Sequence, residues 1–159
     1  MSVIAIYYSF GGNTRGIAGK IADELGAEMA EIRTVKPYMG SYNDVVEQGQ
    51  REVNSGYLPK LKQMDIDLKK YDTLVLGAPV WWYTLAPAMS SFLSETDLKG
   101  KTIYPFATNG GWLGHTFEDF QRACRGAKVM QGLNIRFNES VLRTPRCEID
   151  KWVKQIKQG

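Results

Sequence analysis

The residues best suited to chemistry lie near the start of the chain: Ser9, Phe10, Gly11, Gly12, Asn13 and Thr14. They follow an apolar run at residues 3–8 and precede residues 14–25, whose apolar spacing is that of a helix. Backbone N–H groups at a helix N-terminus lack intrahelical partners, and the helix dipole favours an anion there. The order strand, glycine loop and helix therefore predicts a phosphate site, with Ser9, Asn13 and Thr14 as added donors.

The spacing of this loop excludes two other nucleotide-binding motifs. A P-loop needs Lys-Ser/Thr after its second glycine, and the dinucleotide motif needs G-x-G-x-x-G; neither pattern occurs here. Gly16 and Gly19 instead suggest close packing of the first helix. Because a Ser/Gly-rich segment can also be an ordinary turn, the phosphate-site hypothesis depends on the rest of the chain.

Apolar runs predict five strands, at residues 3–8, 28–35, 72–80, 101–108 and 128–137. Helical spacing predicts five helices, at residues 14–25, 42–54, 86–93, 116–124 and 148–158. Strands that alternate with helices indicate an α/β fold with a parallel sheet. Pro105 fits a central strand poorly, and Gly132 and Asn134 predict that the last strand is bent or split.

Two further strand ends carry unusual residues. The end of the third strand carries Pro79, Val80, Trp81, Trp82 and Tyr83, and the end of the fourth carries Thr108, Asn109, Gly110 and Gly111. Ligands of such sheets bind beyond the carboxyl ends of the strands, where these segments converge. Three adjacent aromatic side chains on a loop cannot all enter the core, so we expect at least one to contact a ligand. Together the three segments indicate a site for a phosphorylated planar ring, and FMN fits best.

These motifs resemble the flavodoxin family. Residues 4–14 resemble its first strand and phosphate loop, residues 77–82 the loop that packs an aromatic ring on the flavin, and residues 108–111 the loop at the pyrimidine edge. The likeness is greatest to short-chain, bacterial flavodoxin-like proteins with Pro-x-Trp-Trp. It implies a flavodoxin-like doubly wound sheet of five parallel strands flanked by helices, in a single domain spanning residues 1–159. It also implies bound FMN and electron transfer to a redox partner protein or a small-molecule electron acceptor.

Two departures from the family pattern leave other functions open. Gly11 replaces a usual Thr or Ser, and residues 9–16, 78–94 and 107–117 contain no Asp or Glu, whereas typical flavodoxins carry carboxylates around the flavin. An FMN-dependent NAD(P)H oxidoreductase acting on quinones or similar flat acceptors is the main alternative. A module of this fold that has lost flavin is the third. His115 is interpreted either as a helix-start residue or as a proton donor near the substrate.

Composition narrows the class of protein. Net charge is +3 and Lys and Arg are scattered, so we expect no nucleic-acid partner. No apolar run approaches the ~18 residues of a membrane span, and Cys124 and Cys147 lack metal-site spacing. We therefore expect a cytoplasmic protein with reduced thiols and without a metal, whose oligomeric state the sequence leaves open.

Overall fold

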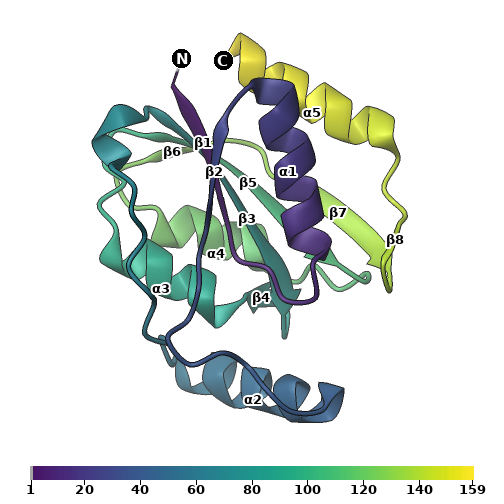
Figure 1. The fold of residues 1–159 in the computed structure, drawn as a ribbon. Helices are drawn as coiled ribbons and strands as arrows, with labels where there is room; N and C mark the ends of the chain where they lie inside the picture. Colours follow the sequence, from purple (N-terminus) through teal and green to yellow (C-terminus); the bar gives the residue numbers. More distant parts are fainter. Residues whose placement is uncertain (1) are drawn as a thin grey trace.

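The computed structural model describes residues 2–159 and contains the five parallel strands predicted from the sequence. They are β1 (Val3–Tyr7), β2 (Glu28–Glu31), β3 (Thr73–Trp81), β5 (Thr102–Asn109) and β7 (Leu133–Asn138). Their order in the sheet is β2-β1-β3-β5-β7 (Figure 1). The chain thus runs outward from β1 in both directions, which makes the sheet doubly wound and puts a switch point between β1 and β3.

Three short strands extend the sheet beyond the predicted five. β4 (Thr84–Leu85) folds back antiparallel on β3, and β8 (Val141–Leu142) does the same on β7. β6 (Lys128–Val129) pairs with the start of β5, and β7 pairs with its end. β6 and β7 are therefore the two halves of the strand predicted to be split.

The split lies opposite Pro105. Ile103 O accepts a hydrogen bond from Met130 N (2.8 Å), and alternate residues of a strand face the same neighbour, so Pro105 also faces the β6–β7 side. Proline has no N–H to donate. Pairing to β6 ends at Ile103 and pairing to β7 begins at Phe106, so the missing donor falls where the ladder is already interrupted.

The predicted strand at residues 28–35 is too long. β2 ends at Glu31; Ile32 N still donates to Tyr7 O of β1 (2.7 Å), and from Arg33 the chain runs antiparallel to residues 60–62. Val35 N donates to Lys60 O (2.9 Å), and Lys62 N donates to Arg33 O (2.8 Å). The alternating pattern correctly predicts an extended chain, but its second half, residues 33–35, pairs with residues 60–62.

All five predicted helices are present, with ends within two residues of the prediction: α1 (Asn13–Leu25), α2 (Tyr42–Ser55), α3 (Pro87–Glu95), α4 (Thr116–Ala123) and α5 (Arg146–Gln158). A 3₁₀ turn, η1 (Leu68–Lys70), precedes β3. Ser41 and Asp44 form a capping box at the start of α2. Among residues 2–159, no helix combines the length and the apolar character that crossing a bilayer requires.

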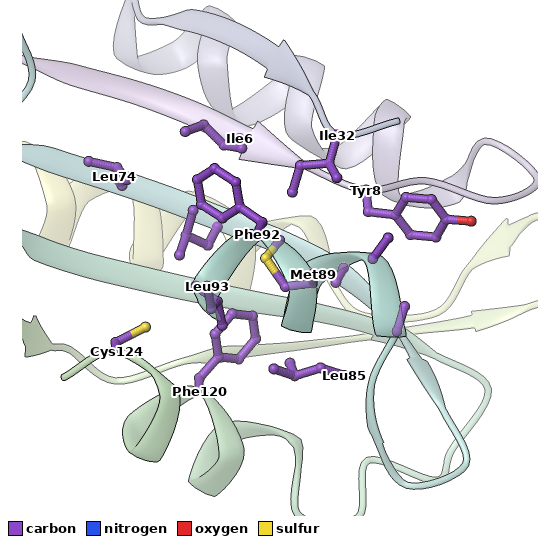
Figure 2. Close-up of a cluster of buried hydrophobic side chains, with 14 of the residues drawn as sticks. Ile6, Tyr8, Ile32, Leu74, Leu85, Met89, Phe92, Leu93, Phe120 and Cys124 are labelled. Atoms are coloured by element: carbon purple, nitrogen blue, oxygen red, sulfur yellow. The ribbon is translucent and has the colours of Figure 1, made fainter. Parts of the chain in front are cut away.

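Helices cover both faces of the sheet. α1 and α5 lie on one face and α3 and α4 on the other, whereas α2 lies beyond the carboxyl ends of the strands (Figure 1). Figure 2 shows the core on the α3/α4 face, where side chains of the central strands, such as Ile6 and Leu74, meet Met89, Phe92 and Phe120. With both faces packed, α2 is free to form part of a site at the sheet edge.

Gly77 in β3 is required by a close contact, whereas Gly16 in α1 is not. A Cβ atom on Gly77 would lie 2.0 Å from Cζ of Phe106, but one on Gly16 or Gly19 would meet nothing within 4 Å. The interpretation of Gly16 and Gly19 as close-packing positions is therefore wrong: α1 presents these residues to open space.

We predict opposite effects on stability for two Gly→Ala changes. Gly77→Ala should lower the free energy of unfolding by about 1–3 kcal/mol, because Phe106 must be displaced from a filled core. Gly16→Ala should raise it by up to about 1 kcal/mol through helix propensity alone. Urea denaturation of both variants measures this, and equal effects of the two changes would contradict the packing described here.

Candidate functional site

A cavity of about 370 Å³ opens where β3 and β5 end. Twelve residues from three loops and from α2 line it: Phe10, Tyr42, Val45, Val46, Gly49, Val80, Trp81, Trp82, Tyr83, Asn109, Gly110 and Trp112. None of these side chains is charged, and six of the twelve are aromatic. The cavity is thus suited to a flat, largely apolar group.

Seven of the fifteen predicted site residues line this cavity: Phe10, Val80, Trp81, Trp82, Tyr83, Asn109 and Gly110. The other eight lie outside its walls: Ser9, Gly11, Gly12, Asn13, Thr14, Pro79, Thr108 and Gly111. Sequence reasoning missed Trp112 and the α2 wall. Val45 and Gly49 share one face of that helix, and this spacing was the available signal.

The loop before α1 presents free backbone donors. Gly11 and Gly12 have left-handed backbones (φ 85° and 97°), and a Cβ atom on either would meet nothing within 4 Å. Ser9 Oγ accepts from Arg15 N (3.1 Å), which orders the turn. Within residues 2–159, no acceptor bonds the N–H groups of residues 11–14. These donors and the α1 dipole together suit a bound anion.

Two predicted side-chain donors in this loop have protein partners instead. Asn13 Nδ2 donates to Glu139 O (2.8 Å), which ties the loop to the β7–β8 turn. The hydroxyls of Thr14 and Thr108 bond each other (2.8 Å) and are buried. These side chains fix the loop against β5 and β7, so an anion here depends mainly on main-chain donors.

Trp81 forms the inner wall of the cavity. It is the last residue of β3, and its ring meets Tyr8, Phe10 and Tyr38 edge-on, with centroids 6.0, 6.1 and 4.8 Å apart. A Cβ atom on Gly49 would lie 3.1 Å from this ring, so α2 approaches closely only because residue 49 has no side chain.

Trp82 and Tyr83 form the two-residue turn between β3 and β4. Both have positive φ (51° and 68°), as a type I′ hairpin turn requires. Large aromatic residues seldom adopt this conformation, which costs about 1 kcal/mol or more at each position. The segment predicted as an aromatic loop is therefore a strained hairpin whose tip reaches the cavity.

Helix α2 on one side and the residue before α4 on the other both bond the tip of this hairpin. Trp82 Nε1 donates to Val46 O in α2 (2.9 Å), and His115 N donates to Tyr83 O (2.9 Å). A Cβ atom on Gly114 would lie 2.3 Å from Tyr83 O, so only glycine permits this approach. The aromatic rings are thus held between α2 and the third loop.

Asn109 orders the third loop. Its Nδ2 donates to Asn134 Oδ1 (2.6 Å), and its Oδ1 accepts from Gly111 N (2.9 Å). This turn brings Gly110 to the cavity and leaves Trp112 at the mouth, 67% exposed. The amide of Asn109 therefore has a structural task beyond ending β5.

His115 lies beside the cavity rather than in its wall. Its Nδ1 is 2.5 Å from Asp119 Oδ2, and Asp119 also bonds Thr84 and Arg122. Burial would raise the pKa of Asp119, but hydrogen bonds with Thr84 and His115 and the nearby charge of Arg122 lower it overall. This network braces α4 against the β4 hairpin, in agreement with the helix-start interpretation of His115.

A buried carboxylate anchors α2 behind Trp81. Glu52 accepts from Tyr38 (2.5 Å) and from Gln48 Nε2 (2.9 Å) and is only 9% exposed. Burial and the hydrogen bond to Glu52 raise the pKa of Tyr38 well above its usual value, so this phenol stays protonated. The contact holds α2 over the sheet edge.

Comparison with known proteins identifies relatives along the whole chain. A family model described as Flavodoxin matches residues 2–156. An uncharacterized protein of Archaeoglobus fulgidus is 26% identical over 156 residues, which cover 93% of this chain and 96% of that protein. A candidate flavoprotein from Bacteroides eggerthii shares the fold with a TM-score of 0.83, 25% identity and 98% coverage of both chains. A Lactobacillus acidophilus flavoprotein in complex with FMN has a TM-score of 0.77 at 21% identity, with 95% of this chain and 97% of that chain covered.

We predict that two neighbouring tryptophan substitutions separate packing from strain. Trp81→Ala should lower the free energy of unfolding by about 2–3 kcal/mol, since its ring packs among three aromatic residues. Trp82→Asn should change stability by less than about 1 kcal/mol, because asparagine tolerates positive φ and offsets the lost hydrogen bond. Chemical denaturation measures both changes. A larger loss of stability for Trp82→Asn than for Trp81→Ala would contradict the conclusion that Trp81 is a packing residue and that Trp82 is strained.

Proposed function

This chain belongs to the flavodoxin family, and we propose that it binds FMN at the cavity and exchanges electrons through it. The observation that carries the proposal is a set of free backbone donors at the start of α1, at the same sheet edge as an aromatic cavity. The donors suit a phosphate dianion, and the cavity suits the isoalloxazine ring. The FMN-bound relative from Lactobacillus acidophilus supports this choice of cofactor.

We assign each part of FMN to a segment of the site from the residues that border it. Residues 9–12 and the N-terminus of α1 hold the phosphate. Trp82 and Trp112 supply aromatic surface for the ring, while Asn109 and Gly110 border its polar edge. Bound FMN supplies the redox chemistry, and the chain supplies binding, orientation and electrostatics. Electrons leave to a redox partner protein or a small-molecule electron acceptor at the open mouth.

A second candidate function is an FMN-dependent NAD(P)H oxidoreductase for quinones or similar flat acceptors. It is favoured by the uncharged cavity walls together with the exposed aromatic rings at the mouth. Tyr42 is 80% and Tyr83 is 50% exposed, so both keep surface for stacking. Without carboxylates in the wall, negative charge on a reduced ring meets less opposition than in an acidic pocket.

We predict that FMN binds about 100-fold more tightly than riboflavin, as expected for two charge-assisted hydrogen bonds of about 1.5 kcal/mol each. Asn13→Asp should weaken FMN binding about tenfold or more, because it places a carboxylate beside the phosphate donors and removes the amide donor to Glu139 O. Riboflavin, which has no phosphate at this loop, should bind nearly unchanged. Quenching of flavin fluorescence measures all four affinities.

The matched control is Gln158→Glu, which adds the same charge at the far end of α5. It should leave both flavin affinities unchanged. Equal affinities of the wild-type protein for FMN and riboflavin would overturn the phosphate assignment. A parallel loss of both flavins in Asn13→Asp would indicate a general structural defect.

The two candidate functions differ in their electron steps. If the uncharged walls govern the flavin, we predict that its two one-electron potentials lie close together and that NAD(P)H reduces it with a quinone as acceptor. Redox titration and NADH or NADPH oxidation, with and without a quinone, test this directly. Widely separated potentials with no NAD(P)H oxidation would instead identify a one-electron carrier.

A further inference from the structure

The guanidinium group of Arg136 lies next to the glycine loop that borders the cavity. A Cβ atom on Gly111 would stand 3.4 Å from Arg136 Nη2, and the preceding residue, Gly110, lines the cavity. Arg136 also pairs with Asn109 across the β5–β7 ladder. The guanidinium group of Arg136, which belongs to β7, therefore lies beside the loop formed by Gly110 and Gly111, two residues without side chains.

The backbone of Arg136 is fixed. Its N–H donates to the buried Thr144 Oγ1 (2.7 Å), and its carbonyl accepts from Arg143 N (2.8 Å). Leu133 and Ile135 turn into the core, so the alternation of β7 directs Arg136 to the opposite face. The position of this residue at the loop is thus set by the strand.

No contact neutralises the charge of Arg136. Arg15, Arg33 and Arg122 each have a carboxylate partner. In the part of the chain from residue 2 to residue 159, no Asp or Glu oxygen lies within 4.0 Å of the Arg136 guanidinium. Because the cavity walls are also uncharged, this cation acts on whatever the cavity holds.

We propose that Arg136 raises the reduction potential of bound FMN by favouring the reduced form of its ring. The inference rests on the proposed function. The oxidised ring is neutral; it takes up two electrons and one proton from a hydride donor of the NAD(P)H class and becomes a monoanion. A nearby cation stabilises that anion and leaves the neutral ring largely unaffected. Arg136 thereby has the opposite effect to the carboxylates that surround the flavin in acidic flavodoxins.

Arg136→Gln tests the proposal through binding and potential rather than turnover. The ratio of affinities for reduced and oxidised FMN should fall three- to tenfold, which corresponds to a potential lower by about 15–30 mV for a two-electron couple. Arg136→Lys should retain most of the wild-type potential. Arg125→Gln removes an equal exposed charge at the other end of the sheet, just before β6, and should leave the potential unchanged.

Added salt tests the proposal first on the wild-type protein itself. The potential of the wild-type protein should fall with rising ionic strength, since salt screens an exposed charge, and that of Arg136→Gln should depend on salt less. An equal loss of affinity for oxidised and reduced FMN would place the charge at the phosphate and overturn the proposal. So would an unchanged potential in FMN-loaded Arg136→Gln, which leaves the proposed function intact. Failure of the wild-type protein to bind FMN would overturn both.

Discussion

The register of β3 between β1 and β5 is the constraint on which the site depends. Tyr7 pairs with Gly77, and Gly77 pairs with Phe106, so β1 ends at this level while β3 and β5 run on beyond it to Trp81 and Asn109. That alignment brings the α1 N-terminus, the aromatic hairpin and the glycine loop to the same edge. Gly77 makes the alignment compatible with a full core, because the Phe106 ring occupies the space where its side chain would be. A packing contact inside the sheet therefore determines the arrangement of the loops outside it.

The two halves of the site are built from different groups, backbone N–H donors in one and aromatic side chains in the other. The half that suits an anion consists of main-chain donors, since the side chains of Asn13 and Thr14 bond other protein groups and hold the loop. The apolar half consists of side chains held by a strained turn, with Trp82 bonded to α2 and Tyr83 bonded to His115. Strain of this kind persists only where the surroundings determine the conformation, and here two separate segments do so. The aromatic surface is consequently pre-organised before any ligand arrives.

The sequence predicted the strands, the helices and the three converging segments, because periodicity and turn chemistry are local properties. The prediction was wrong where a segment could pair with either of two other segments. Residues 33–35 pair with residues 60–62 rather than with β1, and Thr14 bonds Thr108 across 94 positions of sequence. The cavity wall from α2 was missed for the same reason: Val46 and Gly49 look like ordinary helix residues until Trp81 and Trp82 pack on them.

The charges around this site differ from the carboxylate-rich surroundings that the flavodoxin resemblance implies. Two carboxylates beside the hairpin and the inner wall are paired or buried: Asp119 with Arg122 and His115, and Glu52 with Tyr38 and Gln48. Arg136, by contrast, has no such partner among residues 2–159. Arg136 therefore adds positive charge beside the cavity, although no charged group lines it. A pocket of this kind favours a ligand that gains negative charge during reaction, which is the property expected of a flavin that accepts a hydride.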